Sequence, residues 1–514
     1  MTTPTTPPVT YVTTTIPYVN SRPHLGFALE LVQADVLARH RRHRGDEVRF
    51  LSGTDDNSLK NVLAAEAENV PVQDLVDRNA EAFAALRAPL ALSFDDFIRT
   101  SRDPRHRAGV ERLWRQCAAS GDLYRKHYEG LYCVGCEQFY TPAELTEGRC
   151  AEHGTEPQLV AEENWFFRLS RYGDQLRELI TSERLRIEPA VRRNEVLALI
   201  DSGLHDFSVS RSQARARGWG IPVPDDPGQV VYVWWDALGN YVTSLGYGTG
   251  DPAYDRWWRG AARRSHLLGK GVVRFHAVYW PAMLLSAGLP LPTDILVHDY
   301  LTVDGRKISK STGTTVDPAE LVDEFGTDAV RWWLLRDVPR VGDADFTRDR
   351  LVARANADFS GGIGNLVNRV VTMVQRFRGG HVPVRAAAAG DTESLVAVCR
   401  GVQEHVDEAL ADFDFRRATA AVWRIVEEAN RCVDSTRPWD LAKAERSGDV
   451  RAGERLDAVL AALVDACRAL ADQLGPFVPE SAARVAAQCA ESDGRLPAAR
   501  PLFARIGEEG DDRR

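Results

Sequence analysis

A strand–helix–strand pattern near the start of the chain constrains its fold most strongly. Val9 to Ile16 is a β-rich run, and apolar residues then recur at helical spacing from Leu25 to Val36. A second β-rich run, Val48 to Leu51, follows. Such a βαβ unit favours an α/β fold with a doubly wound, Rossmann-like parallel sheet. Ligands of such folds bind beyond the carboxyl ends of the strands, so we expect a nucleotide or substrate near His24 and Asp55.

Two short segments carry residues suited to phosphate chemistry. His24-Leu25-Gly26 lies at the start of the first expected helix, where backbone N–H groups favour phosphate and a glycine allows close approach. Lys307-Ile308-Ser309-Lys310-Ser311 follows an expected strand and a turn. Its two lysines and two serines can neutralise and cradle a triphosphate as pyrophosphate leaves. Taken singly, a helix-capping loop and a solvated basic turn are the commoner explanations.

Four residues in a short insert have the spacing of a zinc site. They read Cys133-x2-Cys136-x13-Cys150-x2-His153. Three thiolates and an imidazole in two close pairs suit tetrahedral zinc, and all four positions are filled, which predicts a structural site. Zinc would then stabilise an insert too small to build its own core. The other five cysteines are scattered, as in a reducing compartment.

The net charge and the hydropathy of the chain limit which nucleic acids and membranes it can bind. The net charge of −9 argues against a protein that coats nucleic acid duplexes. From Arg350 to Arg378, however, there are five Arg and one Asp, a local basic face that can bind a folded RNA. No apolar run reaches the roughly 18 residues of a membrane span, and the Thr/Pro-rich start does not resemble a signal peptide. We therefore expect a cytoplasmic protein that does not contact membranes.

Taken together, these segments resemble a known enzyme family. His24-Leu25-Gly26 resembles the first signature of the class I aminoacyl-tRNA synthetases, and Lys307 to Ser311 resembles the second. Further blocks, spread over nearly the whole chain, are similar to the methionyl-tRNA synthetase family. They are Ile16–Asn20, Asp95–Thr100, Glu162–Phe167, Trp219–Pro224, Tyr232–Ala237, Phe275–Ala282 and Gly364–Arg369.

The resemblance implies a methionine–tRNA ligase, which forms methionyl-adenylate from methionine and ATP and then esterifies tRNA. It implies ATP with Mg²⁺, a structural Zn²⁺, and a tRNA with a CAU anticodon. The implied catalytic residues are His24, Lys307 and Lys310, and the implied ATP site is His24, Gly26, Lys307, Ser309 and Lys310. The implied amino-acid pocket is Ile16, Tyr18, Asp55, Trp234, Ala237, Leu238, Tyr241 and His276, with Asp55 on the substrate ammonium. The implied anticodon contacts are Asn365, Arg369 and Trp439, which offer hydrogen bonds and a stacking face to unstacked bases.

The expected domain order follows from the same blocks. We expect a first catalytic half at 9–120, a zinc-binding connective module at 121–165, the rest of the connective region followed by the second catalytic half with the Lys-Ile-Ser-Lys-Ser loop at 166–349, a helical anticodon-binding bundle at 350–495, and a tail at 496–514.

Three positions depart from the family pattern. Phe27 stands where the first signature ends in a second histidine, Asn57 where an imidazole follows the second strand, and Gly271 where a carboxylate is usual. These losses support a second hypothesis, a divergent paralogue of specialised metabolism. It would transfer an adenylated amino acid to a small-molecule hydroxyl, amine or hydroxylamine, together with a separate partner enzyme. A third hypothesis is a tRNA-binding protein without catalysis, against which the intact Lys307 to Ser311 loop argues.

Overall fold

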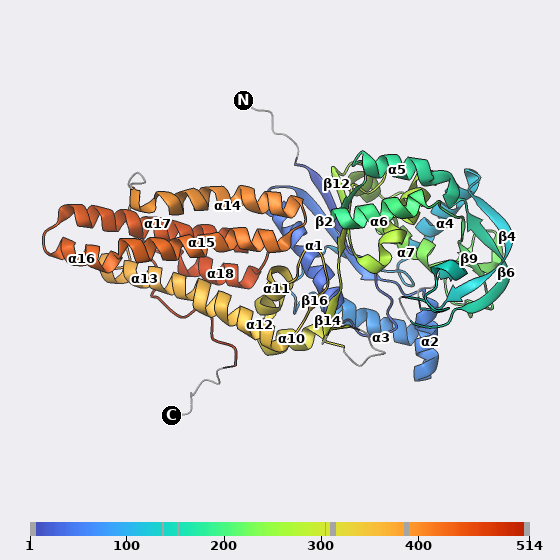
Figure 1. Cartoon of the computed structure of the whole chain (residues 1–514), viewed down its shortest axis with the longest axis horizontal. Helices are drawn as coiled ribbons and strands as arrows, with labels where there is room; N and C mark the ends of the chain where they lie inside the picture. Colours follow the sequence, from blue (N-terminus) through green and yellow to red (C-terminus); the bar gives the residue numbers. More distant parts are fainter. Residues whose placement is uncertain are drawn as a thin grey trace. The chain divides into compact units, whose positions relative to one another are not determined.

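The computed structural model describes residues 7–135, 138–151, 154–303, 305–308, 315–384 and 390–507. The chain forms two compact units (Figure 1). The first consists of Met1–Arg87 and Leu92–His298, and the second of Ala88–Ala91 and Asp299–Arg514. Among the helices that are described, none has an apolar stretch long enough to cross a bilayer.

A six-stranded sheet forms the centre of the first unit, with the strand order β3-β2-β1-β12-β13-β7. Every neighbouring pair is parallel, which confirms the predicted α/β class. Tyr11 and Val12 are consecutive in β1 and both are buried, so both faces of the sheet are covered. The strands are β1 Val9–Thr13, β2 Glu47–Thr54, β3 Asp96–Arg99, β7 Arg186–Glu188, β12 Arg263–Gly269 and β13 Asp294–His298.

The chain order of these strands reverses beside β1. From β1 the chain proceeds to β2 and β3 on one side, and β12 later pairs with the other side of β1. In open parallel sheets such a switch point, at the carboxyl ends of the strands, is where ligands bind. The segments that follow β1, β2 and β12 carry His24, Asp55 and His276, so the fold brings three predicted site residues to this edge.

Helices cover the sheet on both faces. Helix α1 packs against β1, β2 and β12, whereas α4 and α7 pack on each other over an apolar cluster that includes Tyr11, Leu113, Trp235 and Leu268. The helices are α1 Leu25–His43, α2 Leu59–Glu68, α3 Val72–Ala85, α4 Pro104–Ala119, α5 Gly173–Thr181, α6 Ala190–Asp201, α7 Val233–Thr243, α8 Pro252–Tyr254 and α9 Trp280–Ser286, with π-helical turns η3 Asp255–Arg259 and η5 Phe275–Tyr279 and 3-10 turns η1 Pro142–Glu144, η2 Leu169–Tyr172 and η4 Lys270–Val272.

The first unit also holds two smaller antiparallel sheets. One has the order β5-β4-β6-β8 and includes the segment with the predicted cysteine ligands. Its strands are β4 Leu123–Cys133, β5 Gln138–Tyr140, β6 Gln158–Phe167 and β8 Phe207–Ser208. The other has the order β10-β11-β9, with strands β9 Ser210–Ser212, β10 Pro222–Val223 and β11 Asp226–Val231.

The second unit is mainly helical, as predicted for the C-terminal part of the chain. Its three-stranded sheet, β15-β14-β16, consists of β14 Leu301–Val303, β15 Arg306–Lys307 and β16 Ala344–Asp345. The long helices α14, α15 and α17 lie side by side (Figure 1). The helices are α10 Pro318–Phe325, α11 Thr327–Arg336, α12 Arg348–Ala355, η7 Asn356–Gly364, α13 Asn365–Arg378, η8 Gly390–Thr392, α14 Glu393–Ala411, α15 Phe415–Thr436, α16 Pro438–Arg446, α17 Val450–Leu474 and α18 Pro479–Gln488.

A buried arginine ties a distant segment into this second unit. Arg331, on α11, has no exposed surface. Its guanidinium donates to the carbonyl oxygens of Leu90 at 2.9 Å, Pro476 at 3.1 Å and Phe477 at 2.8 Å. Thr327 Oγ1 donates to the carbonyl of Pro89 at 2.8 Å. Hydrogen bonds to a buried charge are worth about 1.5–3 kcal/mol each, so Arg331 is a strong local anchor.

Candidate active site

His24 begins helix α1 with a defined ring orientation. Its Nδ1 accepts a hydrogen bond from the backbone N–H of Gly26 at 3.1 Å, which caps the helix. In the neutral ring Nε2 then carries the proton and is the donor. A side chain at Gly26 would place its Cβ 3.0 Å from His24 Cε1, so this glycine keeps space for the imidazole. The first turn of α1 can therefore present a histidine donor, at the positively polarised end of the helix, to a phosphate.

Phe27, the first departure from the family pattern, is part of the apolar core. It is 8% exposed, and its ring centroid lies 5.2 Å from that of Phe83 on α3, at an interplanar angle of 68°. Such edge-to-face pairs contribute about 0.5–1.5 kcal/mol beyond the burial of their area. The family's second histidine is thus replaced here by a packed ring.

Most of the predicted amino-acid pocket comes together at the carboxyl edge of the sheet. Tyr18 and Trp234 meet edge to face at 6.3 Å, and Trp234 is also nearly perpendicular to His276, at 6.3 Å and 87°. Asp55 lies beside Tyr18 through a parallel β-bridge and is buried. Ala237, Leu238 and Tyr241 follow Trp234 on α7 and are buried, and Ile16 packs at the edge of the same apolar cluster.

The polar end of this pocket has a defined protonation pattern. His276 Nδ1 lies 2.9 Å from the carbonyl oxygen of Val272, which can only accept, so Nδ1 carries the proton. His276 Nε2 must then accept from Tyr241 Oη, 2.8 Å away. Burial lowers the pKa of His276 to about 4 and raises the pKa of Tyr241 well above its usual range. Both groups are therefore neutral near pH 7.

A chain of largely buried hydrogen bonds, called the relay below, connects the segment after β2 with helix α7. The backbone N–H of Asn57 donates to Asp55 Oδ1 at 3.2 Å, and Asn57 Nδ2 donates to Asp236 Oδ2 at 2.7 Å. The other oxygen of Asp236 is in close contact with Nε2 of His106, whose Nδ1 lies 2.8 Å from Thr243 Oγ1. Asn57, the second departure, thus joins the residue expected to hold the ammonium to the helix that carries Trp234.

Four residues at this site did not emerge from the sequence. Asp236 and His106 belong to the relay just described. His266 stacks on Tyr241 at 4.0 Å, and burial lowers its pKa well below the usual value. Lys60 Nζ lies 4.8 Å from the centroid of the Tyr18 ring. Only Asp236, inside the Tyr232–Ala237 block, carried a signal that could have identified it.

The third departure lies in a short exposed turn, and the Lys-Ser segment is described only in part. Gly271 is exposed, in turn η4 directly after β12. In the second unit the backbone of Lys307 pairs with Thr302 in the β14–β15 hairpin. The side chain of Lys307, and Ser309 and Lys310 altogether, lie outside the described residues.

Two of the four predicted zinc ligands are described, and both are buried. Cys133 is 1% and Cys150 0% exposed. Thr155 touches both, because its Oγ1 lies 3.8 Å from Cys133 Sγ and its carbonyl accepts the Cys150 N–H at 2.9 Å. Cys136 and His153 fall outside the described residues, and within the described part no three candidate ligands form a metal-sized group. Two buried, unoxidised thiols near one residue are compatible with a zinc site.

The predicted anticodon residues lie on helices of the second unit. Asn365 is exposed at the start of α13. Arg369, one turn further, donates to Asn430 Oδ1 at 3.1 Å and pairs with Asp434 at 3.4 Å, both on α15. Trp439, on α16, is 42% exposed, which is unusual for so large an apolar ring.

Comparison with known proteins gives one consistent result. A family model described as tRNA synthetases class I (M) matches residues 10–144 and 136–371. The methionine–tRNA ligase of Caldanaerobacter subterraneus is 39% identical over 472 residues, which cover 92% of this chain and 72% of the relative. That of Brucella suis is 38% identical, in a match that covers 97% of this chain and 98% of the relative. The structure of Mycobacterium tuberculosis methionyl-tRNA synthetase in complex with methionyl-adenylate has a TM-score of 0.91 and 36% identity, and covers 97% of this chain and 100% of that one.

Proposed function

The chain belongs to the methionyl family of the class I tRNA synthetases, and we propose that it activates methionine with ATP and transfers the methionyl group to tRNA. The observation that carries this function is a similarity that spans nearly all of this chain. Methionine–tRNA ligases match 92% and 97% of the chain at 39% and 38% identity, and the matching solved structure is of an enzyme bound to methionyl-adenylate. Of the three functions considered from the sequence, the tRNA ligase is the one that the relatives support.

We infer that the aromatic pocket takes the methionine side chain. An unbranched, polarisable thioether suits a slot walled by Tyr18 and Trp234, whose rings meet edge to face. The neutral Tyr241–His276 pair, at 2.8 Å, closes the slot without a charge that an apolar substrate would have to desolvate. Asp55, buried beside Tyr18, is the carboxylate that would pair with the substrate ammonium.

The phosphate groups of ATP would be bound from two segments. His24 Nε2, at the positively polarised start of α1, would contact phosphoryl oxygens, and Gly26 would hold the His24 ring through its N–H and leave space beside it. Lys307 and Lys310 would neutralise the charge that develops on pyrophosphate, Ser309 would donate a hydrogen bond to it, and Mg²⁺ would accompany the nucleotide.

We infer a structural zinc ion held by Cys133, Cys136, Cys150 and His153. The buried thiols of Cys133 and Cys150 fit this role, and such an ion stabilises a small module rather than reacting.

The tRNA would be recognised at its CAU anticodon by the helical unit. Trp439 offers an exposed ring on which a base can stack, and Arg369 and Asn365 offer hydrogen-bond donors on α13. ATP and tRNA are cytoplasmic substrates, so the cytoplasm is where we expect this chain to act.

The three departures from the family pattern favour one second candidate. A ligase that hands the adenylate to a small-molecule nucleophile would need no tRNA, and a rebuilt site around Phe27, Asn57 and Gly271 could serve another amino acid. The packing of Phe27 on Phe83 and the hydrogen bond from Asn57 to Asp236 are the structural observations behind this alternative.

One experiment tests both functions. ATP–pyrophosphate exchange is measured with each of the twenty amino acids, and charging of a CAU-anticodon tRNA is then measured with the amino acid that supports exchange. We expect methionine to support both. His24→Ala should slow exchange by roughly 10²–10³, the cost of removing one positioned donor. His43→Ala, an exposed position at the other end of α1, is the matched control and should not change it. Exchange with a different amino acid, or exchange without charging, would replace the proposal by the small-molecule ligase.

A further inference from the structure

The peptide group between Asp56 and Asn57 contacts the Asp55 carboxylate from one side. Its N–H, which belongs to Asn57, donates to Asp55 Oδ1 at 3.2 Å. Its carbonyl, which belongs to Asp56, accepts from Trp219 Nε1 at 2.8 Å and from Asn61 Nδ2 at 2.9 Å. A peptide group is planar, so the direction of its carbonyl fixes the direction of its N–H. The indole of Trp219 therefore determines how the Asn57 N–H meets the carboxylate.

The hydrogen bonds at the two ends of this peptide group also strengthen each other. A carbonyl that accepts a hydrogen bond is polarised, and the N–H of the same peptide group becomes a better donor. Asp55 and Asp56 are both buried, and hydrogen bonds are electrostatically stronger in such surroundings than in water. The N–H of Trp219 thus stabilises the Asp55 carboxylate without touching it.

The other backbone contacts of this segment come from the central sheet. The N–H of Asp55 donates to the carbonyl of Pro17, in the segment after β1, at 2.9 Å. The N–H of Asp56 donates to Oγ1 of Thr100, directly after β3, at 2.8 Å. Trp219 lies instead in the turn before β10 and reaches the segment from the small β10-β11-β9 sheet.

The turn that carries Trp219 has backbone angles that few side chains adopt. Arg217, Gly218 and Gly220 have φ values of +52°, +70° and +122°. A Cβ at Gly220 would lie 2.6 Å from Val230 Cγ1, so the turn packs closely against β11. Conformations of this kind persist where the surrounding structure imposes them, and they cluster at functional sites. Here the turn directs the indole N–H of Trp219 at the Asp56 carbonyl.

The small sheet also leads directly into the helix of the pocket. Strand β11 ends at Val231, and α7 begins at Val233. Trp234, the next residue of α7, is a wall of the slot that we propose for methionine. The β10-β11-β9 sheet therefore supports the aromatic end of the pocket through α7 and the ammonium end through Trp219.

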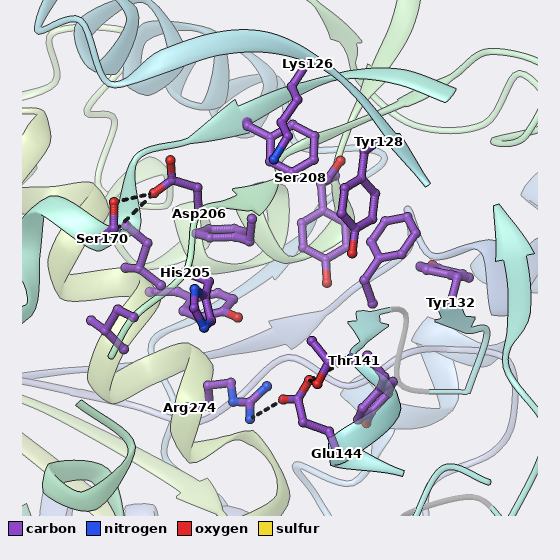
Figure 2. A pocket seen from close by; sticks show the side chains of 18 of the residues that line it. Lys126, Tyr128, Tyr132, Thr141, Glu144, Ser170, His205, Asp206, Ser208 and Arg274 are labelled. Atoms are coloured by element: carbon purple, nitrogen blue, oxygen red, sulfur yellow. Dashed lines mark hydrogen bonds and ion pairs between the residues drawn. The ribbon is translucent and has the colours of Figure 1, made fainter. Parts of the chain in front are cut away.

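The large cleft on the β5-β4-β6-β8 sheet is a separate feature (Figure 2). Its volume is about 540 Å³, and Lys126, Tyr128 and Arg274 are among the residues that line it. Neither Trp219 nor residues 55–57 line this cleft. A substitution at Trp219 therefore tests the ammonium end of the pocket without changing a side chain of the cleft.

We propose that Trp219 is a positioning residue for the substrate ammonium. Its indole N–H orients the Asp56–Asn57 peptide group, and that group in turn orients the Asp55 carboxylate. The inference rests on the proposed function in one respect, which is that Asp55 binds the substrate ammonium. Because Trp219 acts through the peptide group, its loss should affect only those ligands that carry an ammonium group.

Two alcohols that differ by one amino group test the proposal. L-Methioninol has the side chain and the ammonium of methionine, whereas methylthiobutanol has the side chain and the hydroxyl alone. Both are measured as competitive inhibitors of methionine in pyrophosphate exchange by the full chain. Trp219→Phe keeps an apolar ring and loses the N–H. We expect it to raise the inhibition constant of methioninol about fivefold, the net effect of one hydrogen bond, and to leave that of methylthiobutanol unchanged.

The kinetic constants of the same variant separate positioning from a general loss of structure. KM for methionine should rise about fivefold, whereas KM for ATP and kcat should not change, because the ammonium is bound equally before and during the reaction. Trp332→Phe is the matched control. It removes another buried indole N–H, which donates to Asp358 Oδ2 at 2.8 Å in the second unit, and should change none of these constants.

Hydrogen–deuterium exchange of the unaltered chain gives a second measurement that needs no variant. An ammonium on Asp55 should tighten the hydrogen bonds on both sides of the Asp56–Asn57 peptide group. With methioninol bound, we therefore expect slower exchange in residues 54–58 and in residues 216–221. Methylthiobutanol should slow exchange in neither segment.

Three results would overturn the proposal. They are an equal effect of Trp219→Phe on both alcohols, no effect on either, and protection of residues 54–58 by methioninol without protection of residues 216–221. Exchange of pyrophosphate with a different amino acid would contradict the proposed function instead, and the alcohols that correspond to that amino acid would then decide about Trp219. Absence of exchange with every amino acid would contradict both.

Discussion

Replacing Asn57 by aspartate changes one hydrogen-bond donor into a second carboxylate inside a buried relay. Asn57 Nδ2 donates to Asp236 Oδ2 at 2.7 Å, and Asp236 is 1% exposed. The substitution Asn57→Asp preserves size and shape, so its effect reports on charge and on the lost donor. Asp55, which we propose as the ammonium ligand, accepts from the backbone of the same residue.

The magnitude follows from the distance. Two carboxylate charges at this separation repel by about 6 kcal/mol at an effective dielectric constant of about 20. That repulsion corresponds to about 4 pKa units, so one of the two carboxyls would keep its proton into the neutral range. When the shared proton is present, an O–H···O hydrogen bond replaces the N–H···O hydrogen bond that Asn57 donates to Asp236. When it is lost at higher pH, the segment after β2 and helix α7 repel each other.

The assay is methionine-dependent pyrophosphate exchange from pH 6 to pH 9. For Asn57→Asp we expect kcat/KM for methionine to fall at least about tenfold at pH 8 and to recover as the pH is lowered towards 6. Asn57→Ala is the control, because it removes the hydrogen bond to Asp236 without adding a charge. Its decrease in kcat/KM should not depend on pH. A pH profile of Asn57→Asp that matches that of the unaltered chain would refute this account of the relay.

Three further changes test other parts of the site. Phe27→His should not raise the rate of exchange, since Phe27 packs on Phe83; a clear gain in rate would show that the packed ring is only a tolerated loss. Tyr241→Phe leaves the buried Nε2 of His276 without its donor, so we expect about 1–3 kcal/mol less stability and a higher KM for methionine, measured by urea unfolding and by exchange; an unchanged KM would place this pair outside the pocket. Cys133→Ser should release the bound zinc and lower the melting temperature while thermal unfolding of the second unit stays unchanged, and a zinc content equal to that of the unaltered chain would exclude Cys133 as a ligand.

The sequence predicted the parts of this structure that depend on local pattern. The first βαβ unit and the C-terminal helices follow from periodicity in short windows, and the aromatic pocket residues came from blocks that resemble the family. The relay could not be predicted in this way, because Asn57 and Asp236 are 179 residues apart and His106 and Asp236 are 130 apart. Their contacts depend on how α4 and α7 pack over the sheet.

Phe27 illustrates the same limit at a single position. The sequence indicated a missing donor, since phenylalanine cannot bind a phosphate. Only the structure shows where the ring goes, into contact with a helix that begins 45 residues later.

The anchor at Arg331 has a consequence for the order in which the chain can complete its fold. Residues Ala88–Ala91 leave the ribosome long before the helix that binds them, yet they belong to the second unit. The carbonyl of Leu90 accepts from the guanidinium of Arg331, a residue that is synthesised 241 positions later. Neither unit is therefore a single continuous segment that could be exchanged by itself. A chimaera of two such enzymes joined at residue 299 would receive the second unit without Ala88–Ala91, which belong to it. Recombination at that point is therefore disfavoured in evolution as well.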